Sequence, residues 1–424
     1  MKSLAFFVVV AAVFVFAGSA RAGPYELEII VQAGDVIDDH TILSAFSSNP
    51  GNISINNDGE VAFLARVFGP DAQGWSVMTQ RRFIAGAGAV IDGRELGFDN
   101  QDHSTKINNL GQVTYTAFLL SDGFRGVFVD KTLIAERGDV VDGRTILGPN
   151  RGSAINDDGT VAFVALHSLD PPTEGLFTQD RMVVESGQEI DGFTIGGQFG
   201  VEISNTGDIF FRTSLQGFGD GPSEAIVTPD RIVIKPGDVI GGERVYRLAG
   251  GSTVGFTING NGDVVVGFSS LLDGGREEMF VATETEILVR KGDIVDGITI
   301  ARPVDGRLNN AGQLAFFGFV QDEADDAGYL ALFSHDQLIA AEGRLLDGRV
   351  IKRLEDFDIN DRGDLAFHVE FEDSSRVIVR ANHVIPEPDA MVLAAMALIA
   401  LLKVVPRRSL RGSRRRRARR AEVG

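Results

Sequence analysis

One short motif recurs seven times along this chain and constrains its fold more than any other feature. In residues 55–63 it reads Ile-Asn-x-x-Gly-x-Val-Ala-Phe. Successive motif glycines are 52, 48, 48, 55, 50 and 51 residues apart, which indicates tandem structural repeats rather than two or three unrelated domains. The seven glycines are Gly59, Gly111, Gly159, Gly207, Gly262, Gly312 and Gly363.

The motif predicts a tight turn followed by a strand that is buried on both faces. Asn at its first position accepts backbone hydrogen bonds, and Gly allows the positive φ that closes the turn. In the strand that follows, Val61 and Phe63 point to one face while Ala62 and Leu64 point to the other. Both faces are apolar, so each sheet must be covered on both sides, which favours stacked propeller blades over a two-sheet sandwich.

A second motif, Gly-Asp-x-Ile/Val-Asp-Gly, alternates with the first. It occurs at residues 138–143 and 292–297, with looser copies in the other units. A hairpin precedes it, with strands at 126–129 and 133–135 around a turn at 130–131. Each unit of about fifty residues therefore holds about four short strands, the content of one blade. The sequence predicts an all-β fold, a seven-bladed β-propeller over residues 24–385.

The two ends of the repeat array predict that the ring is closed. Residues 27–31 match the second strand of the hairpin but lack an upstream partner, and residues 376–379 match the first strand but lack a full downstream partner. Pairing of these N- and C-terminal strands would complete the seventh blade and remove an exposed sheet edge. The chain has no cysteine, so packing rather than disulfides must hold the fold.

The extreme ends predict export and membrane sorting. Residues 1–22 have the pattern of a signal peptide, with Lys2, an apolar run at 4–16, and the small residues Ala20 and Ala22 at the cleavage site; an uncleaved anchor is the alternative. Residues 386–424 combine a Pro-Glu-Pro motif, an apolar segment at 390–402 and nine arginines. Such a positive cluster stays on the cytoplasmic side of a membrane. We expect an exported body with a transient or permanent C-terminal membrane anchor.

The body is strongly acidic. Residues 24–385 carry 28 Lys and Arg against 56 Asp and Glu, a net charge of −28. This charge repels nucleic acid and favours divalent counter-ions. Asp139 with Asp142, and Asp293 with Asp296, lie three residues apart in glycine-rich turns. Such loops can supply oxygen ligands to calcium, but Asp also suits turns by bonding its own backbone, so both interpretations stay open.

No catalytic constellation is evident in the sequence. The six histidines do not recur at a repeat position, and we expect them at the surface or in turns. No Ser lies in a Gly-x-Ser-x-Gly elbow. Trp75 is expected in the blade core, at the strand position that Val127 and Leu176 occupy in other units. Irregular loops at 215–223 and 321–328 are the places where we expect a polysaccharide or protein ligand to bind.

The Asn-x-x-Gly-x-x-Ala-Phe copies resemble the tandem NxxGxxAF-repeat family of exported bacterial proteins, and the tail resembles a PEP-CTERM sorting signal. The resemblance implies recognition by an exosortase-type membrane enzyme, processing near Pro386, Glu387 and Pro388, and delivery to the cell surface or extracellular matrix. That family has no settled activity. We expect a non-enzymatic binding or structural module; the alternative is a secreted hydrolase or lyase that acts on polysaccharide with carboxylates from different blades.

Overall fold

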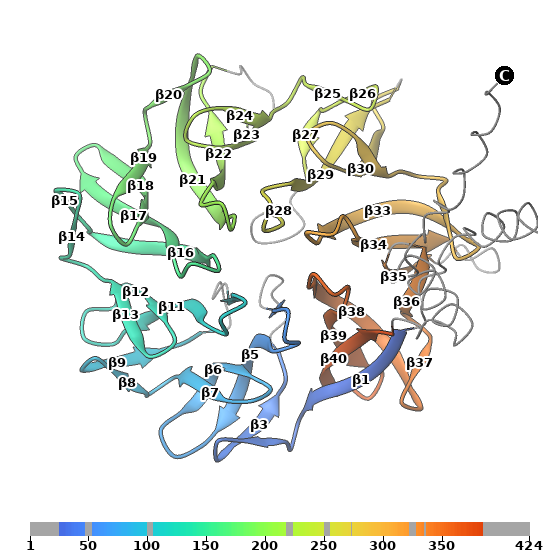
Figure 1. The fold of residues 1–424 in the computed structure, drawn as a ribbon, viewed down its shortest axis with the longest axis horizontal. Coiled ribbons are helices and arrows are strands. Elements are labelled where there is room, and N and C mark those ends of the chain that lie inside the picture. The colour runs from blue at the N-terminus through green and yellow to red at the C-terminus, as the bar shows by residue number, and fades with distance from the viewer. Residues whose placement is uncertain are drawn as a thin grey trace, which may run out of the picture. The chain divides into compact units, whose positions relative to one another are not determined.

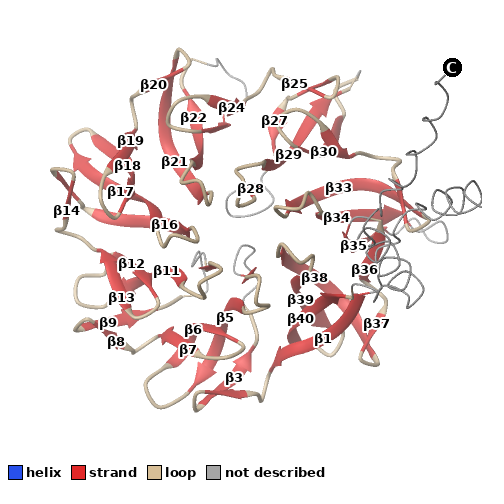
Figure 2. Ribbon diagram, viewed as in Figure 1, coloured by secondary structure: helices blue, strands red, loops and turns tan. Residues whose placement is uncertain are grey.

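Seven antiparallel blades surround a central axis in the computed structural model (Figure 1). The structure describes residues 25–384 apart from 47–52, 100–104, 218–223, 250–254, 273, 322–327 and 335. Across these ranges every regular element is a strand, as the colouring of Figure 2 shows. The predicted all-β, seven-bladed β-propeller is therefore confirmed.

The first three blades follow the chain in order. Each contains four main strands, preceded by a short hairpin or strand that comes from the second motif. The first main strand of blades 1 and 2 is split in two, and both parts pair with the next strand. Blade 1 contains β2 (Val36–Ile37), β3 (His40–Ser44), β4 (Ile53–Ile55), β5 (Val61–Phe68), β6 (Gln73–Thr79) and β7 (Phe83–Gly86); blade 2 contains β8 (Val90–Ile91), β9 (Arg94–Gly97), β10 (Lys106–Ile107), β11 (Val113–Leu119), β12 (Arg125–Val129) and β13 (Thr132–Ala135); blade 3 contains β14 (Val140–Val141), β15 (Arg144–Thr145), β16 (Gly148–Ile155), β17 (Val161–Leu169), β18 (Pro172–Thr178) and β19 (Met182–Glu185).

The remaining four blades repeat the same order, and the last one recruits the first strand of the chain. Blade 4 contains β20 (Glu189–Ile190), β21 (Phe193–Ile203), β22 (Ile209–Leu215), β23 (Glu224–Val227) and β24 (Ile232–Ile234); blade 5 contains β25 (Val239–Ile240), β26 (Glu243–Arg244), β27 (Arg247–Leu248), β28 (Phe256–Ile258), β29 (Val264–Leu271), β30 (Glu277–Ala282) and β31 (Ile287–Val289); blade 6 contains β32 (Ile294–Val295), β33 (Ile298–Leu308), β34 (Leu314–Gln321), β35 (Gly328–Ser334) and β36 (Gln337–Ala341); blade 7 contains β37 (Leu345–Leu346), β38 (Arg349–Ile359), β39 (Leu365–Phe371), β40 (Arg376–His383) and β1 (Tyr25–Gln32).

The ring is closed by β1, as the sequence predicts. This strand pairs antiparallel with β40 along its whole length, from Tyr25 opposite His383 to Gln32 opposite Val377. Glu28 and Arg380 face each other across the pair and form an ion pair of 2.9 Å. The outermost strand of blade 7 therefore comes from the other end of the chain, and closure relies on strand pairing and packing rather than on a covalent link.

Seven separate apolar clusters form the core, one at each interface between neighbouring blades. Strand β5 shows why both of its faces are apolar. Val61 and Phe63 pack toward blade 7, whereas Ala62 and Leu64 pack toward blade 2, and all four are fully buried. The alternation that the motif encodes thus supplies two blade interfaces at once.

Trp75 does not occupy the strand position that we predicted for it. In β6 the partner of Leu64 is Val77, and this pair corresponds to Val164 with Leu176 in blade 3. Trp75 lies two residues earlier, opposite Arg66, and packs half-buried against the cluster between blades 1 and 2. Its assignment to the core holds in part, but the predicted register was wrong by two residues, since Val77 is the residue of β6 that matches Leu176 of β18.

Candidate functional site

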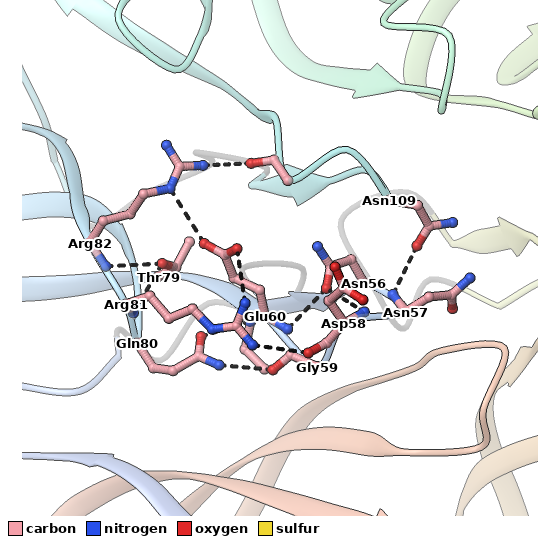
Figure 3. Close-up of polar contacts among 12 residues, drawn as sticks. Asn56, Asn57, Asp58, Gly59, Glu60, Thr79, Gln80, Arg81, Arg82 and Asn109 are labelled. Carbon is pink, nitrogen blue, oxygen red and sulfur yellow. Dashed lines mark hydrogen bonds and ion pairs between the residues drawn. The ribbon is translucent and has the colours of Figure 1, made fainter.

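The motif turn is built as its sequence predicts. The Asn56 side-chain oxygen accepts hydrogen bonds from the backbone N–H groups of Asp58 (3.0 Å) and Glu60 (2.9 Å), and Gly59 closes the turn with φ of 69° (Figure 3). The Gly59 N–H donates back to the Asn56 carbonyl at 3.0 Å. The Asn108 side chain does the same for Leu110 and Gln112. These turns define one face of the ring, here called the motif-turn face.

Each motif Asn also has a second partner, which sequence analysis missed. Its side-chain N–H group donates to the backbone carbonyl of the corresponding residue in the next blade, and the last blade donates back to the first. We call residues Asn56, Asn108, Asn156, Ser204, Asn259, Asn309 and Asn360 the asparagine ring. Its side-chain-to-carbonyl hydrogen bonds run from Asn56 to Asn108 (3.3 Å), Asn108 to Asn156 (2.9 Å), Asn156 to Ser204 (3.2 Å), Asn259 to Asn309 (3.1 Å), Asn309 to Asn360 (2.9 Å) and Asn360 to Asn56 (3.0 Å).

Ser204 replaces Asn in blade 4 and changes that step. Its hydroxyl oxygen still accepts from the Asp208 N–H at 3.0 Å, so the turn is kept. The side chain contacts Thr206 instead of blade 5, and the backbone N–H of Asn205 reaches the Gly260 carbonyl at 2.9 Å. A signal for the ring was present in the sequence, since six copies carry Asn and none carries Asp. Either residue could accept the turn bonds, but only the amide can also donate.

A second circle of polar contacts lies one residue further along each turn. Asp157 accepts hydrogen bonds from the side-chain amides of Asn109 (2.9 Å) and Asn205 (2.6 Å). Asp361 likewise accepts from Asn310 (3.0 Å) and Asn57 (2.8 Å). Blade 5 carries Gly260 here, where an added Cβ would lie 2.7 Å from the Asn205 amide nitrogen and 2.8 Å from that of Asn310. Glycine thus leaves room for the amides of blades 4 and 6.

Residues of both rings, together with charged side chains, line a cavity of about 160 Å³ in the central channel, to which all seven blades contribute. Lys106 of blade 2 reaches Glu202 of blade 4 at 2.8 Å. Arg307 of blade 6 contacts Asp305 at 2.8 Å and Asp356 of blade 7 at 3.8 Å. The Lys106–Glu202 pair thus joins two non-adjacent blades, and Arg307 joins two adjacent ones.

The electrostatics of the channel keep both cations charged. Burial lowers the pKa of Lys106, but the carboxylates of Glu202 and Asp358 outweigh it, so the net shift is upward. Burial lowers the pKa of Arg307, but the nearby carboxylates of Asp305, Asp356 and Asp358 raise it, so the net shift is again upward. A paired, hydrogen-bonded set of this kind fixes the geometry of the blades more than it adds stability.

An arginine links blades 1 and 2 at the outer part of the motif-turn face. Arg82 contacts Glu60 of its own blade at 3.4 Å and Asp130 of blade 2 at 3.1 Å, and it donates to the Gly111 carbonyl. Gln80 in the same turn donates to the Gly59 carbonyl at 2.8 Å (Figure 3). The polar residues of this region therefore bind other parts of the ring.

Asp139, Asp142, Asp293 and Asp296, the predicted calcium ligands, all lie in turns. The Asp139 carboxylate accepts from the Glu136 N–H at 2.8 Å, and the Asp293 carboxylate from the Arg290 N–H at 2.9 Å. Asp142 and Asp296 adopt φ of 50° and 51°, and Asp296 accepts from the Leu338 N–H at 3.3 Å. Among the described residues, no three His, Asp or Glu side chains are grouped to hold a metal ion.

Calcium binding at these turns stays a prediction, and chelation tests it. If calcium bridges the turns, EDTA should lower the melting temperature of the full chain, and added calcium should restore it. An unchanged melting temperature would contradict calcium binding and leave Asp139 and Asp293 with their turn role alone.

The expectation of surface or turn histidines is wrong for three of them: His40, His368 and His167, whose side chain in β17 is 4% exposed. His40 is buried, lies 2.7 Å from Asp71 and stacks on Phe83 with 3.8 Å between ring centroids. His368 is fully buried in β39 and stacks on Phe46 at 4.2 Å, and neither ring nitrogen has a hydrogen-bond partner. Burial, followed by the nearby Arg376 charge, lowers the pKa of His368 to about 3.

Two carboxylates with opposite shifts belong to the same blade as His368. Burial raises the pKa of Glu355, although Arg376 and Arg353 oppose it. A hydrogen bond from Lys352 (2.6 Å) and one from Arg376 lower the pKa of Glu370. Neither residue lines the channel cavity. Pairs of acids whose surroundings separate their pKa values are the pattern that acid–base catalysis uses.

The sorting signals cannot be compared with the structure. Ala20 and Ala22 of the predicted cleavage site, and Pro386, Glu387 and Pro388 of the sorting motif, lie outside the described residues, as does the apolar segment 390–402. Within the described ranges, no helix is long and apolar enough to cross a membrane. His103, His335 and most of loops 215–223 and 321–328 also lie outside the description.

Comparison with protein families finds no match, and comparison with curated proteins finds none either. Solved structures do match. The β-propeller domain of the Trilobed protease from Pyrococcus furiosus is 10% identical, covers 80% of this chain and 95% of that one, and gives a TM-score of 0.44. The polysaccharide lyase Uly1 is 8% identical over 86% and 100%, with a TM-score of 0.40, and a gluconolactonase from Xanthomonas campestris is 12% identical over 71% and 95%, with a TM-score of 0.29. The likeness is one of fold and says nothing about the chemistry of this chain.

Asn108→Ala should destabilise the chain by about 2–3 kcal/mol, because it removes the side-chain oxygen that accepts two turn hydrogen bonds and the amide that binds blade 3, and it leaves backbone groups unpaired. Urea unfolding of the full chain measures this loss. Leu110→Ala is the matched control, since Leu110 lies in the same turn and is 69% exposed. Equal stability of the two variants would contradict the role given to the asparagine ring.

Proposed function

We propose that this chain is an exported protein of the cell surface or extracellular matrix whose propeller is a non-enzymatic binding or structural module. One observation carries the proposal: the recurrent polar residues are used in contacts between blades. Asn108 and Asn156 hold neighbouring blades, and Lys106 with Glu202 joins blades across the channel. Such contacts build a rigid ring, and rigid rings present loops for binding.

The two ends of the chain support this cellular location. Signal peptidase would cut after Ala22, and an exosortase-type enzyme would recognise the Pro386, Glu387 and Pro388 motif and process the tail. Residues 386–424 would anchor the chain in the membrane, either until the tail is processed or permanently. The net charge of −28 on residues 24–385 argues against nucleic acid as a partner.

Cell fractionation of the full chain in a host that exports it tests this location. We expect a mature N-terminus at Gly23 and the body in the envelope or matrix fraction. A matched chain that lacks residues 386–424 should appear in the medium instead. Full-length protein found in the cytoplasm with Met1 still present would contradict the proposal.

A polysaccharide hydrolase or lyase is the second candidate, and the Glu355–Glu370 pair is the observation that favours it. Glu355, with its raised pKa, would be the proton donor, and Glu370 the ionised partner. Turnover of a panel of polysaccharides by the full chain, lost in Glu355→Gln, would establish this function in place of the first. Absence of turnover, with binding retained, would support the binding module.

A further inference from the structure

A basic cavity lies on an otherwise acidic propeller, between blades 5 and 6. Its volume is about 220 Å³, and Arg276, Lys291 and Arg302 line it together. All three side chains are exposed. We call this the basic cavity.

The three cations of the basic cavity are free to bind a ligand. Among the described residues none of them has an ion-pair partner, whereas other cations such as Lys106, Arg247 and Arg307 are paired. Two carboxylates share the cavity, but Glu277 is bound to Arg247 at 2.8 Å. Within the part of the chain that the structure describes, three cations of the cavity therefore face one carboxylate without an ion-pair partner, that of Glu278, on a body of net charge −28.

Arg302 is held in place for recognition. Its guanidinium lies over the Phe319 ring, 4.4 Å from the ring centroid. Stacking uses the flat face of the guanidinium and leaves its N–H donors available at the edge. A planar fork of N–H donors fits a carboxylate with two parallel hydrogen bonds.

The cavity lies on the face opposite the motif turns. It adjoins the end of β29 and the start of β30, and the motif turn of blade 5 lies at the other end of β29 because successive strands are antiparallel. The strand ends that flank the irregular loops, Leu215 in blade 4 and Gln321 in blade 6, point to the same face by the same topology. Sequence analysis predicts ligand binding at those loops.

We propose that the basic cavity binds the carboxylate of an acidic polysaccharide, one sugar unit at a time; this deepens the proposed function and rests on it. Arg276, Lys291 and Arg302 hold the carboxylate, Glu278 accepts from sugar hydroxyls, and Leu272 and Met279 contact the C–H face of the ring. The acidic body opposes polyanions of high charge density, such as nucleic acid. A polymer with one carboxylate per sugar has a lower charge density, so the acidic body repels it less as it approaches the cavity.

Titration calorimetry of the full chain with oligogalacturonate tests this proposal. Its methyl ester is the matched probe, because it keeps the sugar and removes the charge. We expect the acid form to bind about ten-fold or more tightly than the ester, and added salt to weaken it. The triple variant Arg276→Ala, Lys291→Ala, Arg302→Ala should lose that preference.

The triple variant Arg66→Ala, Lys131→Ala, Arg344→Ala is the control, since it removes the same residue types from exposed positions that form no ion pair with any described residue. It should bind like the parent chain. Equal losses in both variants would overturn the basic cavity while leaving a binding module in place. Equal binding of polyglutamate would replace the polysaccharide by an acidic peptide, and cleavage of oligogalacturonate would instead refute the non-enzymatic function.

Discussion

Val31→Asp is expected to destabilise the ring by roughly 4 kcal/mol or more, the largest effect of any single change that we consider. Val31 is fully buried in β1, in the cluster between blades 7 and 1. A carboxylate there would lose its hydration inside an apolar cluster. Release of β1 would also expose the edge of β40, and exposed edges recruit other chains. Urea unfolding together with light scattering measures both consequences.

Leu27→Asp is the matched control for this change. It places the same residue on the same strand, but Leu27 is 38% exposed. We expect a loss of about 1 kcal/mol or less and no association. If both variants were equally stable, β1 would not be the closing strand.

Between pH 7 and pH 4, the free energy of unfolding should fall by about 3 kcal/mol less in His368→Phe than in the parent chain. The folded chain keeps His368 neutral down to about pH 3, whereas the unfolded chain protonates it near pH 6.5. Between these values the unfolded state binds the extra proton, so the free energy of unfolding falls as pH falls. Phe keeps the ring that stacks on Phe46 and cannot titrate.

The comparison requires urea unfolding of the parent chain and the variant at both pH values. Other groups titrate in the same range, so the quantity of interest is the difference between the two pH dependences. At pH 7 the variant should be at least as stable as the parent, because burying the unpaired ring nitrogens of His368 carries a cost. Identical pH dependences would contradict the buried neutral state of His368.

The sequence predicted those parts of the fold that depend on local pattern. The Asn56 and Gly59 turn, the two apolar faces of Val61 and Phe63 against Ala62 and Leu64, and closure by residues 27–31 were all confirmed. Each rests on neighbouring residues, or on a missing partner strand that the repeat makes visible.

What the sequence did not predict depends on partners in other blades. The second bond of Asn108 goes to a carbonyl 48 residues away, and the Lys106–Glu202 pair spans 96 residues. His368 looked like an exposed polar residue because nothing nearby in sequence shows that Phe46 covers it. The three cations of the basic cavity come from residues 276–302 and converge only because blades 5 and 6 are adjacent.

Disulfide mapping across the closing strand pair tests the central claim, a closed seven-bladed ring, most directly. The chain has no cysteine, so Glu26→Cys with Asn382→Cys introduces a single pair at residues that lie directly opposite each other. Directly opposed strand residues are about 4.5–5.5 Å apart at Cα, within disulfide reach. Glu28→Cys with Asn382→Cys is the out-of-register control. We predict near-complete intramolecular bonding and a raised melting temperature for the first pair alone; only intermolecular bonds, or equal bonding of both pairs, would contradict the closed ring.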